Sequence, residues 1–136
     1  MTDNKLGITD SLLLAAEEER ISKRKAIRMW EEGRLDSLAA GSFDALSEIH
    51  RFLFSDIYDF AGKVRTVNLV KGSFRFASAM YLAEAIRQVE RMPQNSFEQI
   101  VSKYVEMNIV HPFREGNGRS TRIWLDLIFK KEIGMV

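Results

Sequence analysis

Apolar residues recur at helical spacing along most of this chain of 136 residues, and glycines and prolines divide the pattern into segments. This spacing places apolar side chains on one face of an α-helix, which is stable when that face packs against other elements. One stretch, roughly residues 66–77, instead has the residue types of a short β-hairpin. The sequence therefore predicts an all-α fold with one hairpin. The expected helices cover residues 10–32, 43–53, 80–92, 97–110 and a segment that runs from Arg119.

Several helix boundaries are marked by residues that satisfy or end the backbone hydrogen bonding of a helix. Ser42 is a candidate N-cap, and Ser96 with Gln99 has the Ser-x-x-Gln pattern of a capping box. Gly33 and Pro93 are typical of positions where a helix stops. These signals predict separate helices joined by short connections.

The first predicted helix has a loose apolar period, and we expect it to be interrupted. An acidic run at residues 17–19 adjoins a basic run further along the same helix. The basic run could form a stripe that binds nucleic acid, but the balance of charges favours a solvated helix face. The basic residues are Lys23, Arg24, Lys25 and Arg28.

The composition excludes several kinds of function. The chain has no cysteine, which excludes disulfides, thiolate metal sites and a cysteine nucleophile. Twenty Lys and Arg residues against nineteen Asp and Glu residues give a net charge of +1, so direct nucleic-acid binding is not expected. No apolar run approaches the ~18 residues that a membrane span requires. We therefore expect one cytoplasmic domain, residues 1–136, with no membrane association.

The segment at residues 111–122 lies between two predicted helices and reads His-Pro-Phe-Arg-Glu-Gly-Asn-Gly-Arg-Ser-Thr-Arg. Gly116 and Gly118 allow the backbone to approach a ligand, and the N-terminus of the following helix presents unpaired N–H groups that favour an anion. Arg119 and Arg122 lie three residues apart in the expected first turn, where cations oppose the helix dipole. A polyphosphate would compensate for that opposition, so the sequence predicts a phosphate-binding site.

Two further residues of this segment could supply chemistry. Glu115 would be repelled by phosphate unless a cation lay between them, and Mg²⁺ is commonly held by one or two carboxylates together with substrate phosphates. His111, with an ordinary pKa of about 6.5, suits removal of a proton from a hydroxyl. Each residue taken singly also has a structural interpretation as a helix cap, a turn or a surface ion pair. Their conjunction within twelve residues favours transfer of a phosphate-containing group.

This segment resembles the signature of the Fic family, His-x-Phe-x-(Asp or Glu)-Gly-Asn-Gly-Arg-x-x-Arg, and it matches every fixed position. The resemblance covers roughly residues 40–131 and implies an α-helical Fic domain. His50 belongs to a second similar stretch, in which we expect it to be structural rather than catalytic. That stretch also includes Ile49, Arg51, Leu53, Phe54, Tyr58, Ala61, Gly62, Lys63 and Arg65.

The resemblance implies a protein adenylyltransferase, which moves AMP from ATP to a Ser, Thr or Tyr hydroxyl of a target protein or of itself and releases pyrophosphate. On this basis His111 deprotonates the hydroxyl and Glu115 binds magnesium at the α- and β-phosphates. Arg122 reaches the terminal phosphate. The remaining phosphate-binding residues implied are Gly116, Asn117, Gly118 and Arg119.

The predicted hairpin is similar to the family's flap, which holds the target by strand-like main-chain pairing. The flap residues are Lys71, Gly72, Ser73, Phe74, Arg75 and Phe76.

Regulation is where the sequence departs from many family members. Those members carry an inhibitory helix with the pattern (Ser or Thr)-x-x-x-Glu-(Gly or Asn), whose glutamate pairs with the second motif arginine. Only Ser102 and Glu106 have the required spacing here, but Met107 follows them, so we expect this inhibitory element to be absent. The chain ends in the apolar run at residues 133–136, soon after the motif helix, which is consistent with a truncated form or with inhibition by a separate partner.

Two other functions remain open from the sequence. The Doc toxins of the same superfamily transfer the γ-phosphate, but they have lysine in place of the second motif glycine, which is Gly118 here. The other alternative is a catalytically idle module that binds nucleotide or a partner protein.

Overall fold

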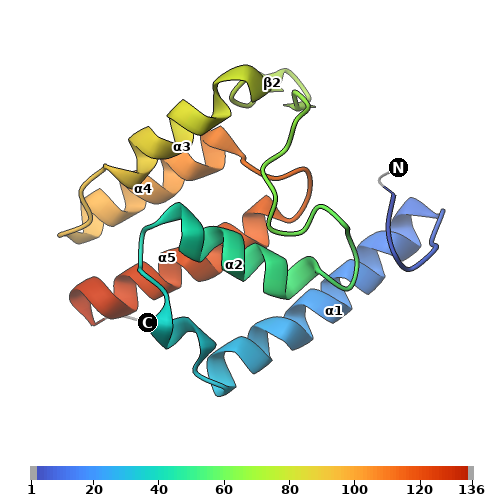
Figure 1. The fold of residues 1–136 in the computed structure, drawn as a ribbon, viewed down its shortest axis with the longest axis horizontal. Helices are drawn as coiled ribbons and strands as arrows, with labels where there is room; N and C mark the ends of the chain where they lie inside the picture. The colour runs from blue at the N-terminus through green and yellow to red at the C-terminus, as the bar shows by residue number, and fades with distance from the viewer. Residues whose placement is uncertain (1–2, 135–136) are drawn as a thin grey trace.

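The computed structural model describes residues 3–134, in which five α-helices and a two-stranded hairpin form the regular structure (Figure 1). The predicted all-α fold with one hairpin is confirmed. The second half of the apolar run at 133–136 lies outside the described residues. The helices are α1 (Ser11–Glu31), α2 (Phe43–Phe54), α3 (Leu82–Glu90), α4 (Phe97–Val110) and α5 (Asn117–Ile133), with 3-10 turns at Arg34–Ser37 and Ala79–Tyr81.

Helix α1 is continuous over its 21 residues, which corrects the expected interruption. The side chain of Asp10 caps its start by accepting hydrogen bonds from the backbone N–H groups of Leu12 and Leu13. Only Leu14, Ser22 and Met29 of this helix are buried. Because so narrow a stripe touches the rest of the protein, the helix needs few apolar positions, and a loose period does not break it.

The predicted caps of α2 and α4 are present. The hydroxyl of Ser42 accepts from the N–H of Ala45, and that of Ser96 accepts from the N–H of Gln99. The stretch predicted as one helix from 80 to 92 is shorter, because its first residues form a 3-10 turn and α3 ends at Glu90.

Helix α5 is the centre of the core. It packs against α2 on one side and α4 on the other, α1 covers α2, and α3 covers α4 (Figure 1). Trp124 of α5 is fully buried and donates a hydrogen bond from its indole nitrogen to the carbonyl of Ser42, 2.9 Å away. Among the described residues, no helix is both long and apolar enough to cross a membrane.

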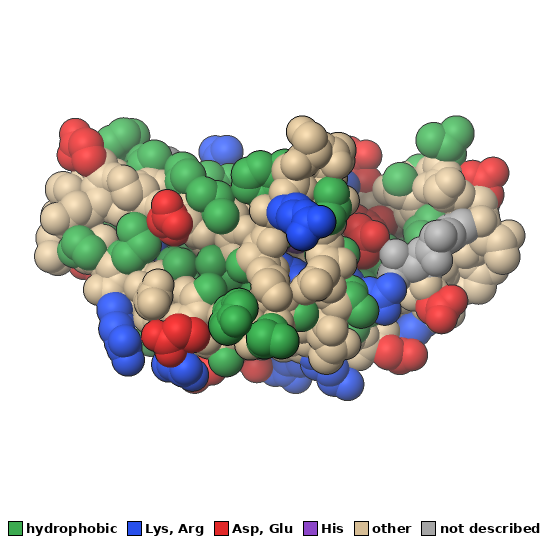
Figure 2. Space-filling view, turned by 90° about the horizontal axis from the view of Figure 1, so that it is seen from above, with side chains coloured by type: hydrophobic (Ala, Val, Ile, Leu, Met, Phe, Trp, Pro, Cys, Tyr) green, Lys and Arg blue, Asp and Glu red, His purple; other side chains and the backbone are tan. Residues whose placement is uncertain are grey.

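The hairpin consists of β1 (Val70–Lys71) and β2 (Phe74–Arg75), which pair antiparallel with Lys71 opposite Phe74. Gly72 has a φ of 62°, and a two-residue hairpin loop requires a positive φ that glycine adopts without strain. The predicted hairpin is confirmed, although the paired part is shorter than residues 66–77. Hydrophobic side chains, including Val70 and Phe74, are exposed on the face that carries the hairpin and α3 (Figure 2).

Candidate active site

The candidate site lies on the loop between α4 and α5, and this loop begins with an unusual backbone conformation at His111. His111 is the C-cap of α4 with φ 54° and ψ 66°, and it is the one non-glycine residue with positive φ in the described part of the chain. Its N–H still donates to the carbonyl of Met107 at 3.0 Å. Histidine is among the few residue types enriched in this left-handed region. The conformation turns the chain sharply out of the helix and points to a functional constraint at His111.

The imidazole of His111 is held by two contacts. It stacks on Phe76 at the end of the hairpin, with ring centroids 3.8 Å apart. One ring nitrogen is hydrogen-bonded to the main-chain carbonyl of Asn108, so the other is the nitrogen that can accept a proton. Burial lowers the pKa of His111, the Asn108 hydrogen bond opposes this effect, and the charges of Arg65 and Lys71 lower the pKa further. The ring is therefore mainly neutral near pH 7, as a base must be.

Arg65 fixes the loop to the base of the hairpin. Its buried guanidinium donates to the carbonyl of His111 at 2.6 Å and to that of Val110 at 3.0 Å. It also donates to the carbonyls of Val67 and Ala77, which flank the hairpin. One side chain thus sets the position of the hairpin relative to His111. Burial lowers the pKa of Arg65, but an arginine remains charged at any physiological pH.

His50 supports the loop from the inside of the protein. Its Nδ1 accepts from the N–H of Gly62 at 2.9 Å, so the ring proton lies on Nε2, which donates to the carbonyl of Glu115 at 2.7 Å. The ring stacks on Phe113 with centroids 3.8 Å apart. Burial lowers the pKa of His50 to about 4, and the hydrogen bond to Glu115 opposes the shift. Both nitrogens are in use within the core, which agrees with the structural role expected for His50.

Gly116 and Asn117 also have structural roles in the loop. Asn117 is buried, and its side chain accepts from the N–H of Phe113 and donates to the carbonyl of the same residue. Gly116 has a φ of 77°, and a Cβ added there would lie 2.4 Å from the ring of Phe54. Both residues therefore shape the loop, and what they can offer a ligand is their backbone rather than a side chain.

The N-terminus of α5 has the features of an anion-binding site. Gly116 is its N-cap and gives no side-chain capping bond, unlike the serines that cap α2 and α4. The first N–H groups of a helix have no intrahelical partner and carry the positive end of its dipole. A Cβ added at the exposed Gly118 would meet nothing within 4 Å. No internal packing explains this glycine, whereas close approach of a ligand to the backbone would.

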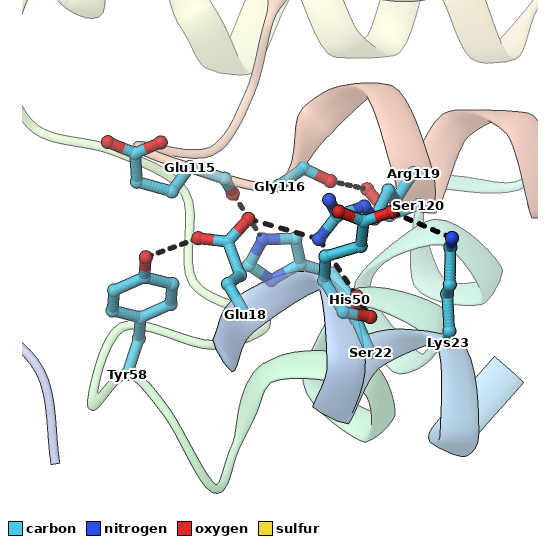
Figure 3. A network of polar contacts seen from close by, with 10 residues as sticks. Glu18, Ser22, Lys23, His50, Tyr58, Glu115, Gly116, Arg119 and Ser120 are labelled. Atoms are coloured by element: carbon cyan, nitrogen blue, oxygen red, sulfur yellow. Dashed lines mark hydrogen bonds and ion pairs between the residues drawn. The ribbon is translucent and has the colours of Figure 1, made fainter. Parts of the chain in front are cut away.

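The two motif arginines are in different environments. Because α5 begins at Asn117, Arg119 lies in the first turn but Arg122 lies in the second, which corrects the expectation for Arg122. The Arg122 side chain is 68% exposed and pairs with Asp126 at 3.5 Å. Arg119 is 38% exposed and contacts α1, where its Nη1 lies 3.2 Å from Glu18 and 2.9 Å from Ser22 (Figure 3). Both arginines line a groove of about 310 Å³ between α1 and α5.

The backbone carbonyl and the side chain of the half-buried Glu115 point in opposite directions. Its carbonyl contacts His50, and Figure 3 shows its carboxylate turned away from that ring. The described residues contain no group of three or more His, Cys, Asp or Glu side chains that could hold a metal ion by themselves. A metal bound at Glu115 would need most of its ligands from substrate and water, and this is the usual coordination of Mg²⁺ at phosphates.

The sequence interpretation missed the contribution of α1. The sequence predicts a solvated face for the acidic run at 17–19, and Glu17 and Glu19 do form exposed ion pairs with Arg20 and Lys23. Glu18 instead points inward, and its carboxylate accepts a hydrogen bond from the hydroxyl of Tyr58 at 2.5 Å (Figure 3). The available signal was spacing, because Leu14, Glu18 and Ser22 are four residues apart and share one helix face.

Residues 41–129 match the Fic/DOC family, and the chain belongs to that family. It is 34% identical over 140 residues to protein adenylyltransferase VbhT of Bartonella schoenbuchensis, covering 90% of this chain and 29% of the relative. It is 31% identical over 134 residues to the "Probable protein adenylyltransferase Fic" of Salmonella typhimurium, covering 90% of this chain and 64% of the relative. The chain thus spans less than two thirds of each of these relatives.

Solved structures show the same fold. The BepC effector of Bartonella tribocorum, crystallised with bound AMPPNP, superposes with a TM-score of 0.83 over 97% of this chain and 74% of that chain, at 19% identity. The N-terminal Fic domain of Bep8 from Bartonella sp. 1-1C superposes with a TM-score of 0.81 over 96% of this chain and 70% of that chain, at 18% identity.

Proposed function

We propose that this protein is a protein adenylyltransferase that transfers AMP from ATP to a Ser, Thr or Tyr hydroxyl of a protein target. The observation that carries the proposal is that one short loop holds both the His111 imidazole, fixed by a left-handed backbone and a stack on Phe76, and the uncapped N-terminus of α5. The first group can accept a proton from an alcohol, and the second favours phosphate oxygens. The relatives named as adenylyltransferases support the choice of AMP as the transferred group.

In the proposed reaction the target's hydroxyl oxygen attacks the α-phosphorus of ATP. A new oxygen–phosphorus bond forms, the bond from the α-phosphorus to the bridging oxygen breaks, and pyrophosphate leaves with the bonding electrons. His111 takes the hydroxyl proton on the ring nitrogen that is not bonded to the Asn108 carbonyl. The left-handed backbone at His111 and the stack on Phe76 orient the ring for this transfer.

The phosphates would be bound by backbone N–H groups at Gly116, Asn117 and Gly118 and by the motif arginines. The open space in front of Gly118 supports close approach of an oxygen atom to the backbone. Arg119 would assist in the first turn of α5, and the more exposed Arg122 would reach the terminal phosphate. The side chain of Asn117 would hold the loop rather than the ligand.

Magnesium is part of this proposal, and the residues present fit it. A single carboxylate, Glu115, adjoins the phosphate-binding N-terminus, and ATP brings the other anionic oxygens that Mg²⁺ prefers. Bound there, the ion would offset negative charge on the phosphates. Glu115 would hold it, while the hydrogen bond from His50 fixes the backbone of Glu115.

The hairpin from Lys71 to Phe76 would hold the target. Its strands have only two residues each and are exposed, so their outer edges can pair with an extended segment of another chain. Arg65 ties the base of the hairpin to the backbone of His111. A target segment paired with the hairpin would therefore lie at a fixed distance from the imidazole of His111.

The test is incubation with magnesium and ATP labelled at either the α- or the γ-phosphate, with bacterial proteins and the protein itself as acceptors. We expect label from the α position on protein and none from the γ position, and its loss in His111→Asn. Transfer of γ-label instead would establish a Doc-like phosphotransferase. ATP binding by calorimetry without transfer of either label would indicate an idle binding module.

The setting we propose is the cytoplasm, where ATP and protein targets are available. We also propose that residues 1–136 act as one Fic domain and that inhibition comes from a separate partner. Mixing with a partner that lowers the transfer of α-label would support this mode of regulation, whereas activity that is already suppressed in the isolated protein and recovers on Ser102→Ala or Glu106→Ala would contradict it.

A further inference from the structure

We propose that Glu18 of α1 is a positioning residue for nucleotide binding, acting by orienting Arg119 through one edge of its guanidinium. The inference rests on the proposed function, because it assigns Arg119 to phosphate. Its basis is a pair of contacts made by Glu18 of α1 (Figure 3). Glu18 contacts Tyr58, which lies in the segment that follows α2, and it also contacts Arg119 of α5. Of these three residues, only Arg119 belongs to the motif that identifies the family.

The position of Glu18 is fixed independently of Arg119. Its side chain is only 17% exposed, and the buried hydroxyl of Tyr58 donates to Oε2 at 2.5 Å. Burial, together with the hydrogen bond to Glu18, raises the pKa of Tyr58, so this hydroxyl remains a donor at all physiological pH values. The other oxygen, Oε1, is directed at Arg119. Glu18 therefore presents a carboxylate oxygen to Arg119 at a defined place.

Glu18 could either orient Arg119 for phosphate or occupy the donors that phosphate needs, and the number of N–H donors left on Arg119 decides between the two. A guanidinium has five N–H donors, one on Nε and two on each terminal nitrogen. The described residues give Arg119 two hydrogen bonds, to Glu18 and to Ser22, and both come from Nη1. Both hydrogens of Nη1 are thus used, and the three on Nε and Nη2 remain for a ligand. That remaining edge is the one that forks onto two oxygens of a phosphate.

A blocking contact would have a different geometry. A carboxylate that competes with phosphate would bind the forked edge in a bidentate manner, whereas Glu18 makes one contact at 3.2 Å from the opposite edge. The hydroxyl of Ser22, accepting at 2.9 Å, acts from the same edge. Without these contacts, the Arg119 side chain would lose rotational freedom about several bonds when it binds phosphate. Immobilisation by Glu18 and Ser22 before the ligand binds lowers that entropic penalty.

The experiment measures ATP binding by calorimetry and adenylyl transfer in wild-type protein and in Glu18→Gln, which keeps the shape and removes the charge. We expect the Kd for ATP and the KM for ATP to rise about tenfold and kcat to change less than about threefold. Tyr58→Phe should weaken ATP binding by about threefold. Glu17→Gln is the matched control, because Glu17 lies on the same turn and, within residues 3–134, its ion pair is with the exposed Arg20.

A double-mutant cycle separates positioning from general stability. In an Arg119→Ala background, Glu18→Gln should have no further effect on the Kd for ATP. Unchanged or tighter ATP binding by Glu18→Gln would overturn the inference, and tighter binding would identify Glu18 as a block. If Glu18→Gln fails to fold, Ser22→Ala tests the same edge of Arg119 and should weaken binding in the same direction. Wild-type protein that binds no ATP would overturn the proposed function and this inference together, whereas unchanged binding in the variants would contradict the inference alone.

Discussion

The inner and outer sides of the loop between α4 and α5 are built on different principles. On the inner side, His50, Gly116 and Asn117 are packed or hydrogen-bonded within the protein. On the outer side, a Cβ added at Gly118 would meet nothing within 4 Å, and the helix N-terminus beside it has no side-chain cap. His111 lies at the junction in a strained conformation. The inner residues therefore contribute mainly to stability, and the outer residues are explained by a ligand.

The two histidines provide the largest contrast. His111→Asn, which retains a residue type that tolerates positive φ, should reduce the rate of adenylyl transfer by roughly 10²- to 10⁴-fold, because the base is lost. It should change the free energy of unfolding by less than about 1 kcal/mol. His50→Ala should instead lower that free energy by about 3 kcal/mol, because it leaves two backbone groups unpaired and opens a cavity.

Transfer assays and urea denaturation of the two histidine variants make this measurement. A stable His50→Ala protein, or a His111→Asn protein with full activity, would break the distinction between the two sides of the loop.

The two glycines should behave as a second pair. Gly116→Ala should lower the free energy of unfolding by about 2 to 4 kcal/mol, because its φ is 77° and the new methyl group would overlap the Phe54 ring. Gly118→Ala should leave stability within about 0.5 kcal/mol, since alanine favours a helix and meets open space. It should still weaken ATP binding. Thermal unfolding and calorimetry on both variants test this, and equal destabilisation by the two substitutions would contradict it.

The pH dependence of stability sharpens the assignment of His50. Its pKa is about 4 in the folded protein and about 6.5 when unfolded, so the unfolded state binds the proton first as pH falls. Stability from this group is complete above pH 6.5 and is lost between pH 6.5 and about 4, amounting to about 3 kcal/mol. Urea denaturation across this range should show a smaller pH slope in His50→Gln than in wild type. Equal slopes would show that His50 is not the buried neutral group.

The smallest expected effect concerns the charge of the hairpin. Lys71 lowers the pKa of His111, so Lys71→Ala should raise it. Because the base must be neutral, the acidic limb of the kcat/KM profile should move to higher pH. Lys63→Ala is the control, since Lys63 is not among the groups that shift the pKa of His111. Movement of the limb to lower pH in Lys71→Ala would contradict the role of His111 as base.

Local sequence signals predicted most of the fold because they act within a few residues. The Ser42 and Ser96 caps and the Gly72 turn each depend on the backbone of the next few positions, and all are present. The extent of the helices was harder to predict. Helix α1 continues where its apolar period suggested a break, and α5 starts at Asn117 rather than Arg119, because packing and the loop geometry decide where a helix ends.

What the sequence determined by itself was the content of the loop, from His111 to Arg122, and the helical class of the fold. Only the tertiary structure decided what each residue faces. It placed Glu18 and Tyr58 behind Arg119, and it placed Arg65 between His111 and the hairpin. These contacts join residues 40 to 101 positions apart. Spacing along a chain fixes which side chains share a helix face, but the packing of whole helices fixes which faces meet.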